Sequence, residues 1–134
     1  MDELKFSKLF KPGRIGSMEL KNRIVMAPTG CNITRGDGFV TRRMISYYVE
    51  RAKGGVSLII VEGTPIDRLG VALPYQLRLY DDKFIPALKQ LANAIKEYDV
   101  KIGIQTNHIG ALTSSKFLGQ LPLSPSGVPP PSNP

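Results

Sequence analysis

The sequence predicts an α/β fold with parallel strands, and two features of its hydrophobic pattern lead to that prediction. Three short apolar runs, at 23–27, 56–61 and 101–106, lack the polar alternation of half-exposed strands and are typical of strands covered on both faces. Between them lie two segments, 44–52 and 84–95, whose apolar residues recur at helical spacing. Connections of this length between strands are those of a parallel sheet.

The residues before the first apolar run are expected to form a leader and a short β-hairpin, together covering 1–21. Lys11-Pro12-Gly13-Arg14 is a turn signal, and 15–20 has the pattern of two small strands that reverse direction at Gly16. The first strand of the sheet then follows, and the glycine-rich segment 29–40 is expected to be a loop.

Each of the two helices carries its own start signal. Thr41 is a suitable N-cap for the first helix, and Gly54-Gly55 is expected to end it. Asp81 or Asp82 is expected to cap the second helix after a loop at 64–80. The predicted apolar stripes consist of Met44, Ile45, Tyr48, Val49 and Ala52, and of Phe84, Ile85, Leu88, Leu91, Ala92 and Ile95. Pro86 is tolerated because it falls in the first turn.

Polar and small residues follow all three predicted strands. The clusters are Ala27-Pro28-Thr29, Glu62-Gly63-Thr64 and Gln105-Thr106-Asn107-His108. Right-handed crossovers place the carboxyl ends of parallel strands on one edge of the sheet, where ligands gather in barrels and open sheets. This convergence predicts a ligand site at that edge.

Three parallel strands neither close a barrel nor cover a sheet, so we expect these residues to be part of a larger fold. The segment from Leu121 to Pro134 carries six prolines and no apolar periodicity. An extended loop is the simpler interpretation of this segment, although its prolines also resemble ligands of SH3-type domains.

Composition narrows the classes of function. A formal charge of +7 raises the possibility of nucleic-acid binding, but the basic residues are dispersed without interleaved aromatic residues and support only non-specific attraction. No apolar run approaches the length of a membrane-spanning helix. The single cysteine, Cys31, excludes a disulfide within the chain and a zinc or iron–sulfur site built by it, so we expect no metal and a cytoplasmic location.

Three motifs in order resemble the old yellow enzyme family of FMN-dependent oxidoreductases, particularly its NADH:flavin oxidoreductases and 2,4-dienoyl-CoA reductases. They are 22–29 (NRIVMAPT), 58–63 (LIIVEG) and 104–110 (IQTNHIG). The resemblance implies a TIM (β/α)8 barrel, of which this chain would supply the first three βα units, preceded by a β-hairpin cap. The barrel would be incomplete, with strands and helices at 22–108 and a proline-rich loop at 109–134.

The resemblance also implies roles for individual residues. The residues implied to contact FMN are Ala27, Pro28, Thr29, Gly30, Gly63 and Gln105, with Asn107 on the substrate face. A primary amide at Gln105, which is expected to be buried and so to need partners, suits the flavin edge because it offers both a donor and an acceptor. Simpler alternatives remain open: Pro28 could only end a strand, and Gly63 could only form a turn.

Two positions depart from the family pattern. The usual His-x-Gly-Arg reads His108-Ile109-Gly110-Ala111, and Gly30 stands where many members hold a cysteine or threonine, with Cys31 one residue later. His108 has no carboxylate or cysteine near it in the sequence, so a structural hydrogen bond is expected for it. No catalytic residue is expected in this chain.

The implied reaction is hydride transfer from NAD(P)H through FMN to an activated C=C bond of an α,β-unsaturated carbonyl or enoyl thioester. A homo-oligomer is expected at full length. Two alternatives remain: a barrel enzyme of the α/β class without flavin, and a catalytically incomplete fragment or subunit that another chain completes.

Overall fold

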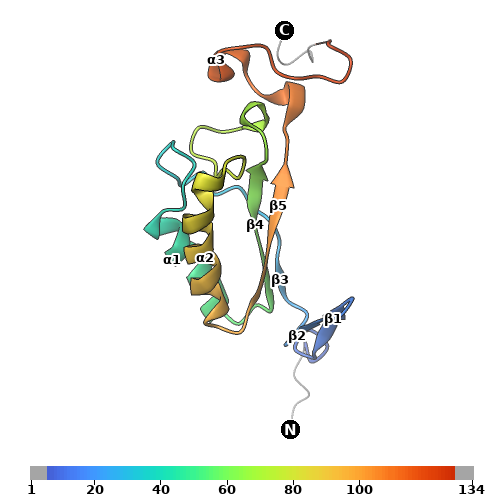
Figure 1. The fold of residues 1–134 in the computed structure, drawn as a ribbon. Helices are drawn as coiled ribbons and strands as arrows, with labels where there is room; N and C mark the ends of the chain where they lie inside the picture. The colour runs from blue at the N-terminus through green and yellow to red at the C-terminus, as the bar shows by residue number, and fades with distance from the viewer. Residues whose placement is uncertain (1–5, 129–134) are drawn as a thin grey trace.

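The computed structural model describes residues 6–128, which form a parallel sheet with two helices against it (Figure 1). The strands and α-helices are β1 (Gly13–Ile15), β2 (Met18–Leu20), β3 (Val25–Met26), α1 (Arg42–Lys53), β4 (Leu58–Pro65), α2 (Ile85–Lys96), β5 (Lys101–Asn107) and α3 (Ser115–Leu118). Three short 3-10 turns are η1 (Arg68–Gly70), η2 (Asp82–Phe84) and η3 (Gly110–Leu112). The small hairpin and α3 lie toward opposite ends of the molecule.

The main sheet has the order β3-β4-β5 with both pairings parallel, as predicted. Val25 is in register with Leu58, which in turn is in register with Lys101. The register between β4 and β5 shifts between Val61 and Thr64. The predicted bounds differ at all three strands: β3 is confined to two residues, β4 continues past Val61 to Pro65, and β5 ends one residue later, at Asn107.

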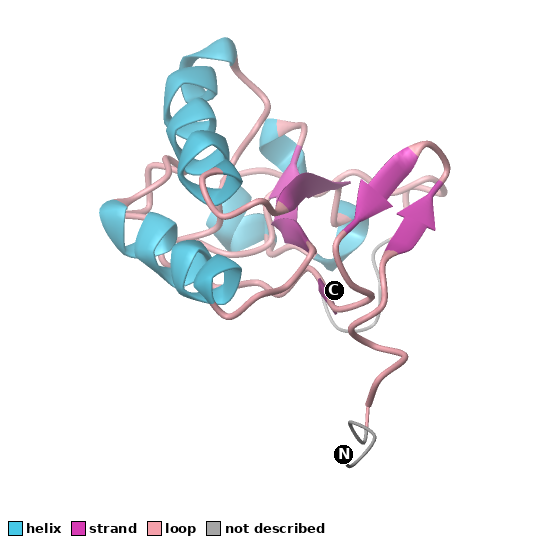
Figure 2. Cartoon of the chain, turned by 90° about the horizontal axis from the view of Figure 1, so that it is seen from below, coloured by secondary structure: helices cyan, strands magenta, loops and turns pink. Residues whose placement is uncertain are grey.

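The predicted hairpin is present, with β1 and β2 antiparallel and Ile15 paired with Met18. Gly16 lies in the tight turn with φ of +58°, a conformation that glycine adopts without steric cost. Figure 2 shows this hairpin beside the sheet and apart from the helices.

The start and end of α1 follow the prediction. The Thr41 hydroxyl accepts a hydrogen bond from the Met44 N–H at 3.2 Å, which caps the helix. Gly55, with φ of +90°, turns the chain toward β4. The buried side of α1 holds Met44, Tyr48 and Ala52.

The start of α2 differs from the prediction. Asp81 caps the short turn η2 by accepting from the Lys83 N–H at 3.0 Å, and α2 begins only after that turn. Ile85 was expected in the buried stripe but is 53% exposed, because it begins the helix on its outer side. Phe84, Leu91 and Ile95 are buried as predicted.

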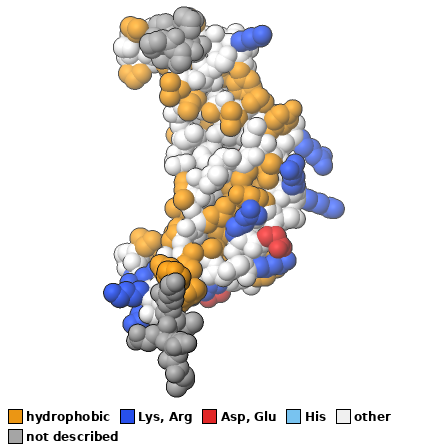
Figure 3. Space-filling model, turned by 180° about the vertical axis from the view of Figure 1, so that it is seen from behind, with side chains coloured by type: hydrophobic (Ala, Val, Ile, Leu, Met, Phe, Trp, Pro, Cys, Tyr) orange, Lys and Arg blue, Asp and Glu red, His pale blue; other side chains and the backbone are white. Residues whose placement is uncertain are grey.

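The core lies between the sheet and the two helices. Its buried members are Met44, Tyr48, Ala52, Ile59, Val61, Leu77, Leu91, Ile95 and Val100. A shallow apolar groove of about 290 Å³ remains where β5 meets α2, lined in part by Leu88, Ile102 and Ile104. Figure 3 shows hydrophobic side chains gathered on the face seen from behind. The apolar surface expected at the edge of an unfinished fold is therefore present.

The segment after β5 is more regular than the predicted loop. It contains η3 and the single-turn helix α3, which ends at Gly119 with φ of +74°. The proline run Pro129–Pro131 lies outside the described residues. No helix in residues 6–128 has the length and apolar character to cross a membrane.

Candidate ligand site at the strand ends

Two amide side chains flank Gly63 at the carboxyl ends of β4 and β5. A Cβ atom at Gly63 would lie 3.2 Å from Gln105 Oε1 and 3.3 Å from Asn107 Nδ2. Both amides therefore point to the same side of β5, as strand alternation predicts. The absence of a side chain at Gly63 leaves room for the two amides.

These two amides differ in their surroundings. Gln105 was expected to be buried, but it is exposed, and its amide makes no hydrogen bond within residues 6–128. Asn107 is half-buried, and its Oδ1 is enclosed without a hydrogen-bond partner among those residues. An enclosed acceptor without a donor is costly and marks a place where a ligand or water can bind.

The end of β3 contributes a second polar segment to the same edge. Ala27, Thr29 and Gly30 are exposed and Pro28 is half-buried. A Cβ at Gly30 would meet no atom within 4 Å, so the backbone there is open to a flat ligand. Since β4 lies between β3 and β5, the segment 27–30 and Gln105 share this edge without pairing directly.

Glu62 joins the loops around this edge, a role that the sequence interpretation did not assign. Its side chain is fully enclosed, at 0% exposure. Oε2 accepts from the Cys31 N–H at 2.6 Å and Oε1 accepts from the Leu77 N–H at 3.2 Å. The backbone N–H of Glu62 donates to Tyr48 Oη at 3.0 Å. The available sequence signal for this role was a glutamate directly after the apolar run 56–61.

Gln76 is a second buried polar group that the sequence interpretation missed. Its Nε2 donates to the Gly63 carbonyl at 2.6 Å, and its Oε1 accepts from the Ala72 N–H at 2.8 Å and the Leu73 N–H at 3.3 Å. The side chain therefore fixes the backbone of Gly63 to the loop that follows β4. No local sequence pattern distinguishes such a glutamine from a solvent-exposed one.

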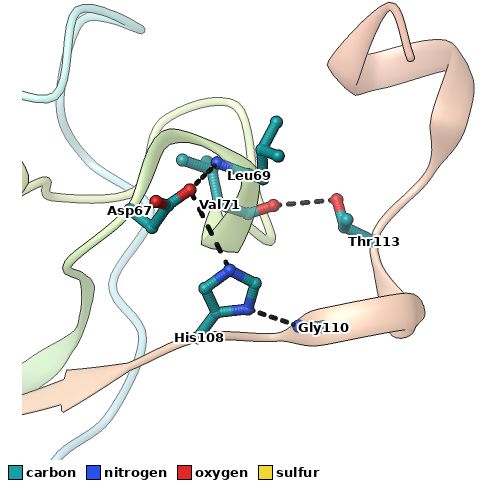
Figure 4. A network of polar contacts seen from close by, with 6 residues as sticks. All are labelled: Asp67, Leu69, Val71, His108, Gly110 and Thr113. Atoms are coloured by element: carbon teal, nitrogen blue, oxygen red, sulfur yellow. Dashed lines mark hydrogen bonds and ion pairs between the residues drawn. The ribbon is translucent and has the colours of Figure 1, made fainter. Parts of the chain in front are cut away.

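His108 joins η1 to the segment after β5 (Figure 4). Its Nδ1 accepts from the Gly110 N–H at 3.0 Å, which is the structural hydrogen bond expected for this residue. The sequence showed no carboxylate near His108, but the fold brings Asp67 Oδ1 to 4.0 Å from Nε2. The Thr113 hydroxyl donates a hydrogen bond to the Val71 carbonyl at 2.8 Å, which joins the same two segments. His108 is thus part of a loop contact.

Cys31 lies beside this edge with two tyrosines near it. Its Sγ donates to the Thr29 carbonyl at 3.3 Å. Burial raises the pKa of the Cys31 thiol above its ordinary value; the Tyr47 hydroxyl opposes this shift and the Glu62 carboxylate adds to it. Burial also raises the pKa of Tyr48 well above its ordinary value. Both groups are therefore neutral at physiological pH.

The geometry suits a flat ligand with hydrogen-bonding atoms along one side. Gln105 and Asn107 offer amide donors and acceptors above a glycine, and the backbone at 27–30 is open. The isoalloxazine ring of FMN has such an edge, so the residues present fit it. Within residues 6–128 no group of three or more His, Cys, Asp or Glu side chains could hold a metal ion.

Comparisons with known proteins identify the family and the fold of this chain. A sequence profile of the NADH:flavin oxidoreductase / NADH oxidase family matches residues 8–130. The chain is 44% identical over 126 residues to an NADH oxidase of Thermoanaerobacter brockii, covering 92% of this chain and 19% of the relative. The chain therefore spans about a fifth of that protein's length.

Two solved structures are similar. The old yellow enzyme homologue of Zymomonas mobilis aligns with a TM-score of 0.83 and 33% identity over 90% of this chain and 34% of its own. A 2-naphthoyl-CoA reductase in complex with 2-naphthoyl-CoA aligns with a TM-score of 0.80 and 33% identity over 84% of this chain and 17% of its own. The fold corresponds to part of an old yellow enzyme barrel. On these matches, the chain belongs to the NADH:flavin oxidoreductase / NADH oxidase family.

Proposed function

We propose that this chain supplies part of the flavin site of an FMN-dependent oxidoreductase that uses NAD(P)H to reduce an activated C=C bond. The observation that carries the proposal is the pair of amides above Gly63, with Asn107 Oδ1 enclosed and without a partner in residues 6–128. Family membership supports the same cofactor. Bound FMN would supply the hydride-transfer chemistry that amino-acid side chains lack.

Each candidate residue has a defined task in this proposal. The exposed backbone of Ala27, Pro28, Thr29 and Gly30 would border the flavin ring, with Gly63 leaving space for its edge. Gln105 would hydrogen-bond the polar edge of the ring, because its amide is exposed beside Gly63. Asn107, one alternation further along β5, would face the substrate.

The remaining parts of the enzyme are proposed to come from further chain. Residues 6–128 would form the hairpin cap and the first three βα units of the barrel, and the apolar groove at β5 and α2 would receive the next unit. The proton donor and the groups that bind the FMN phosphate would lie in that remainder. A homo-oligomer at full length is part of the proposal.

The substrate class is proposed to be an α,β-unsaturated carbonyl compound or an enoyl thioester. The similarity to a reductase solved with 2-naphthoyl-CoA supports a thioester, since that ligand carries an unsaturated group next to a thioester carbonyl. An adjacent carbonyl makes a C=C bond accept hydride, which is the requirement that both compound classes share.

The test is FMN binding by the full-length protein. We expect a yellow protein that absorbs at about 450 nm, a property of the flavin itself. Gln105→Leu should raise the Kd for FMN about tenfold, because a buried donor or acceptor on the ring loses its partner. Thr106→Val is the matched control, since Thr106 faces the other side of β5, and its Kd should stay within about twofold of wild type.

Two results would contradict the proposal. A colourless protein that takes up no added FMN would leave a barrel enzyme without flavin as the better interpretation. An equal Kd for wild type and Gln105→Leu would remove Gln105 from the site. Bleaching of the flavin by NADH or by NADPH under anaerobic conditions would identify the reductant.

A further inference from the structure

Glu62 has a position that none of the assigned roles explains. It directly precedes Gly63 in β4, and its carboxylate contacts the loops that carry Cys31 and Leu77. The side chain is fully enclosed. Among residues 6–128 the structure gives it no Lys, Arg or His partner, although buried carboxylates usually have one.

Backbone N–H groups take the place of a cation. Each carboxylate oxygen accepts one N–H, from Cys31 at 2.6 Å on Oε2 and from Leu77 at 3.2 Å on Oε1. Hydrogen bonds to a charged acceptor are stronger than those between neutral groups. The two donors lie 46 positions apart in the sequence, on loops that follow different strands.

The two loops that Glu62 joins are those that border the proposed flavin edge. Cys31 directly follows Gly30, and its thiol donates a hydrogen bond to the Thr29 carbonyl at 3.3 Å. Leu77 directly follows Gln76, whose amide holds the Gly63 carbonyl at 2.6 Å. Movement of the Cys31 N–H away from Glu62 would therefore shift the 28–31 loop. Movement of the Leu77 N–H would shift the segment through which Gln76 holds Gly63, so either change alters the position of the loop relative to Gly63.

We propose that Glu62 is a positioning residue that fixes the 28–31 loop relative to Gly63 and so sets the shape of the flavin-binding edge. The inference rests on the proposed function for the ligand's identity, but the contacts that define it do not depend on the ligand. Glu62 is not proposed to touch the flavin, because its side chain is fully enclosed and both carboxylate oxygens accept backbone N–H groups.

The geometry makes glutamine a poor replacement. A carboxylate has two acceptor oxygens and both are used, whereas a glutamine amide has one acceptor and one NH₂ donor. In Glu62→Gln, one of the two backbone N–H groups would face another donor. The loop carrying that N–H is expected to move, although the side chain keeps its volume.

The experiment compares Glu62→Gln with Glu50→Gln in the full-length protein. Glu50 is the matched control because it carries the same charge, lies on α1 and is exposed, with Lys53 as its ion-pair partner. We expect the Kd for FMN to rise about tenfold in Glu62→Gln and to stay within about twofold in Glu50→Gln. Circular dichroism checks that both variants are folded.

A second readout reports on Cys31 without requiring flavin. Burial is the main cause of the raised pKa of the Cys31 thiol, and the Glu62 carboxylate raises it further, whereas Tyr47 and Tyr48 lower it. Glu62→Gln should therefore lower the pH midpoint for alkylation of Cys31, measured by mass spectrometry on its peptide in flavin-free protein. Glu50→Gln should leave that midpoint unchanged.

The outcomes separate this inference from the proposed function. If wild type binds no FMN, the proposed function fails. A changed pH midpoint for Cys31 alkylation in Glu62→Gln would still support the positioning role of Glu62. If wild type binds FMN and Glu62→Gln matches it in Kd and in Cys31 midpoint, the inference is wrong. Should Glu62→Gln fail to fold, hydrogen exchange of the wild-type peptides that contain Cys31 and Leu77 is the deciding measurement. Exchange rates equal to those of free peptides would contradict the positioning role of Glu62, and strong protection would support it.

Discussion

Two neighbouring strands of the same sheet, β4 and β5, have very different surroundings. In β4 six of the eight residues are buried, whereas none of the seven residues of β5 is. Both strands carry a pair or more of branched apolar residues in their first half and polar residues in their second half. The difference comes from their neighbours, because within residues 6–128 β4 pairs on both sides and β5 pairs with β4 alone. Burial here depends on position in the sheet more than on composition.

The polar groups show the same contrast. Around the end of β4, the side chains of Glu62 and Gln76 are buried and hydrogen-bonded to five backbone groups between them. At the end of β5, Gln105 is exposed and Asn107 Oδ1 has no partner within residues 6–128. The first arrangement holds loops in place, and the second is available to a ligand.

The largest expected effect is at the centre of β4. Ile59 is fully enclosed, so Ile59→Ala should lower the free energy of unfolding by about 2–5 kcal/mol through lost burial and a residual cavity. Urea denaturation measures this change. Ile15→Ala serves as the control, since Ile15 is 53% exposed on the hairpin, and a comparable loss there would mean that burial in β4 does not govern stability.

A second substitution tests whether β5 is covered at full length. Ile104 is half-buried in residues 6–128 and lines the groove beside α2. If further chain fills that groove, Ile104→Ala in the full-length protein should cost about 2–4 kcal/mol, close to the range for a buried isoleucine. A cost below about 1 kcal/mol would show that β5 stays at an edge and would contradict the proposed barrel completion.

The sequence predicted the elements of this fold well because their signals are local. Apolar runs without alternation indicated the parallel strands, and Thr41 with its helical stripe indicated α1. The departures are also local in origin. Asp81 caps a 3-10 turn before the helix, and no pattern distinguishes one turn of 3-10 helix from the first turn of α2.

The candidate site was less predictable because its contacts span long sequence distances. Alternation correctly placed Gln105 and Asn107 on one side of β5, and their residue-level roles remain proposals. The contacts of Glu62 with Cys31 and of His108 with Asp67 join residues 31 and 41 positions apart, so only the fold brings them together. Exposure of Gln105 could not be predicted either, since it depends on what covers β5.

Gly70 provides a test of the loop contact made by His108. A Cβ at Gly70 would lie 2.8 Å from His108 Cδ2 and 3.2 Å from its Cα, which is backbone and cannot turn aside. Gly70→Ala should cost about 1–3 kcal/mol, measured by urea denaturation. Gly103→Ala is the control on β5, where a Cβ would meet nothing within 4 Å in residues 6–128. A larger loss at Gly103 than at Gly70 in the full-length protein would mean that further chain packs tightly on β5.

A smaller effect is expected at the N-cap of α1, the helix in the layer that covers β4. Thr41→Ala removes the hydroxyl that accepts the Met44 N–H and should cost about 1 kcal/mol. Ser46→Ala, at an exposed position inside the same helix, should be neutral or slightly stabilising because alanine favours helix. Thermal denaturation of both variants measures the difference, and equal melting temperatures would show that the cap contributes nothing.

The smallest effect is expected from Asp81, which begins the segment leading into α2 and is exposed. The Lys83 backbone N–H, followed by the Lys83 ammonium, holds the pKa of Asp81 below its ordinary value of 3.8. A carboxylate whose pKa is lowered by folding stabilises the protein above the unfolded-state pKa, and that stabilisation is lost as the pH falls through the folded-state pKa. Asp81→Asn should therefore reduce the pH dependence of the melting temperature at acidic pH while changing little at neutral pH, because asparagine still accepts the Lys83 N–H. NMR titration of the Asp81 carboxyl measures its pKa directly, and a value at or above 3.8 would contradict the capping contact at the start of α2.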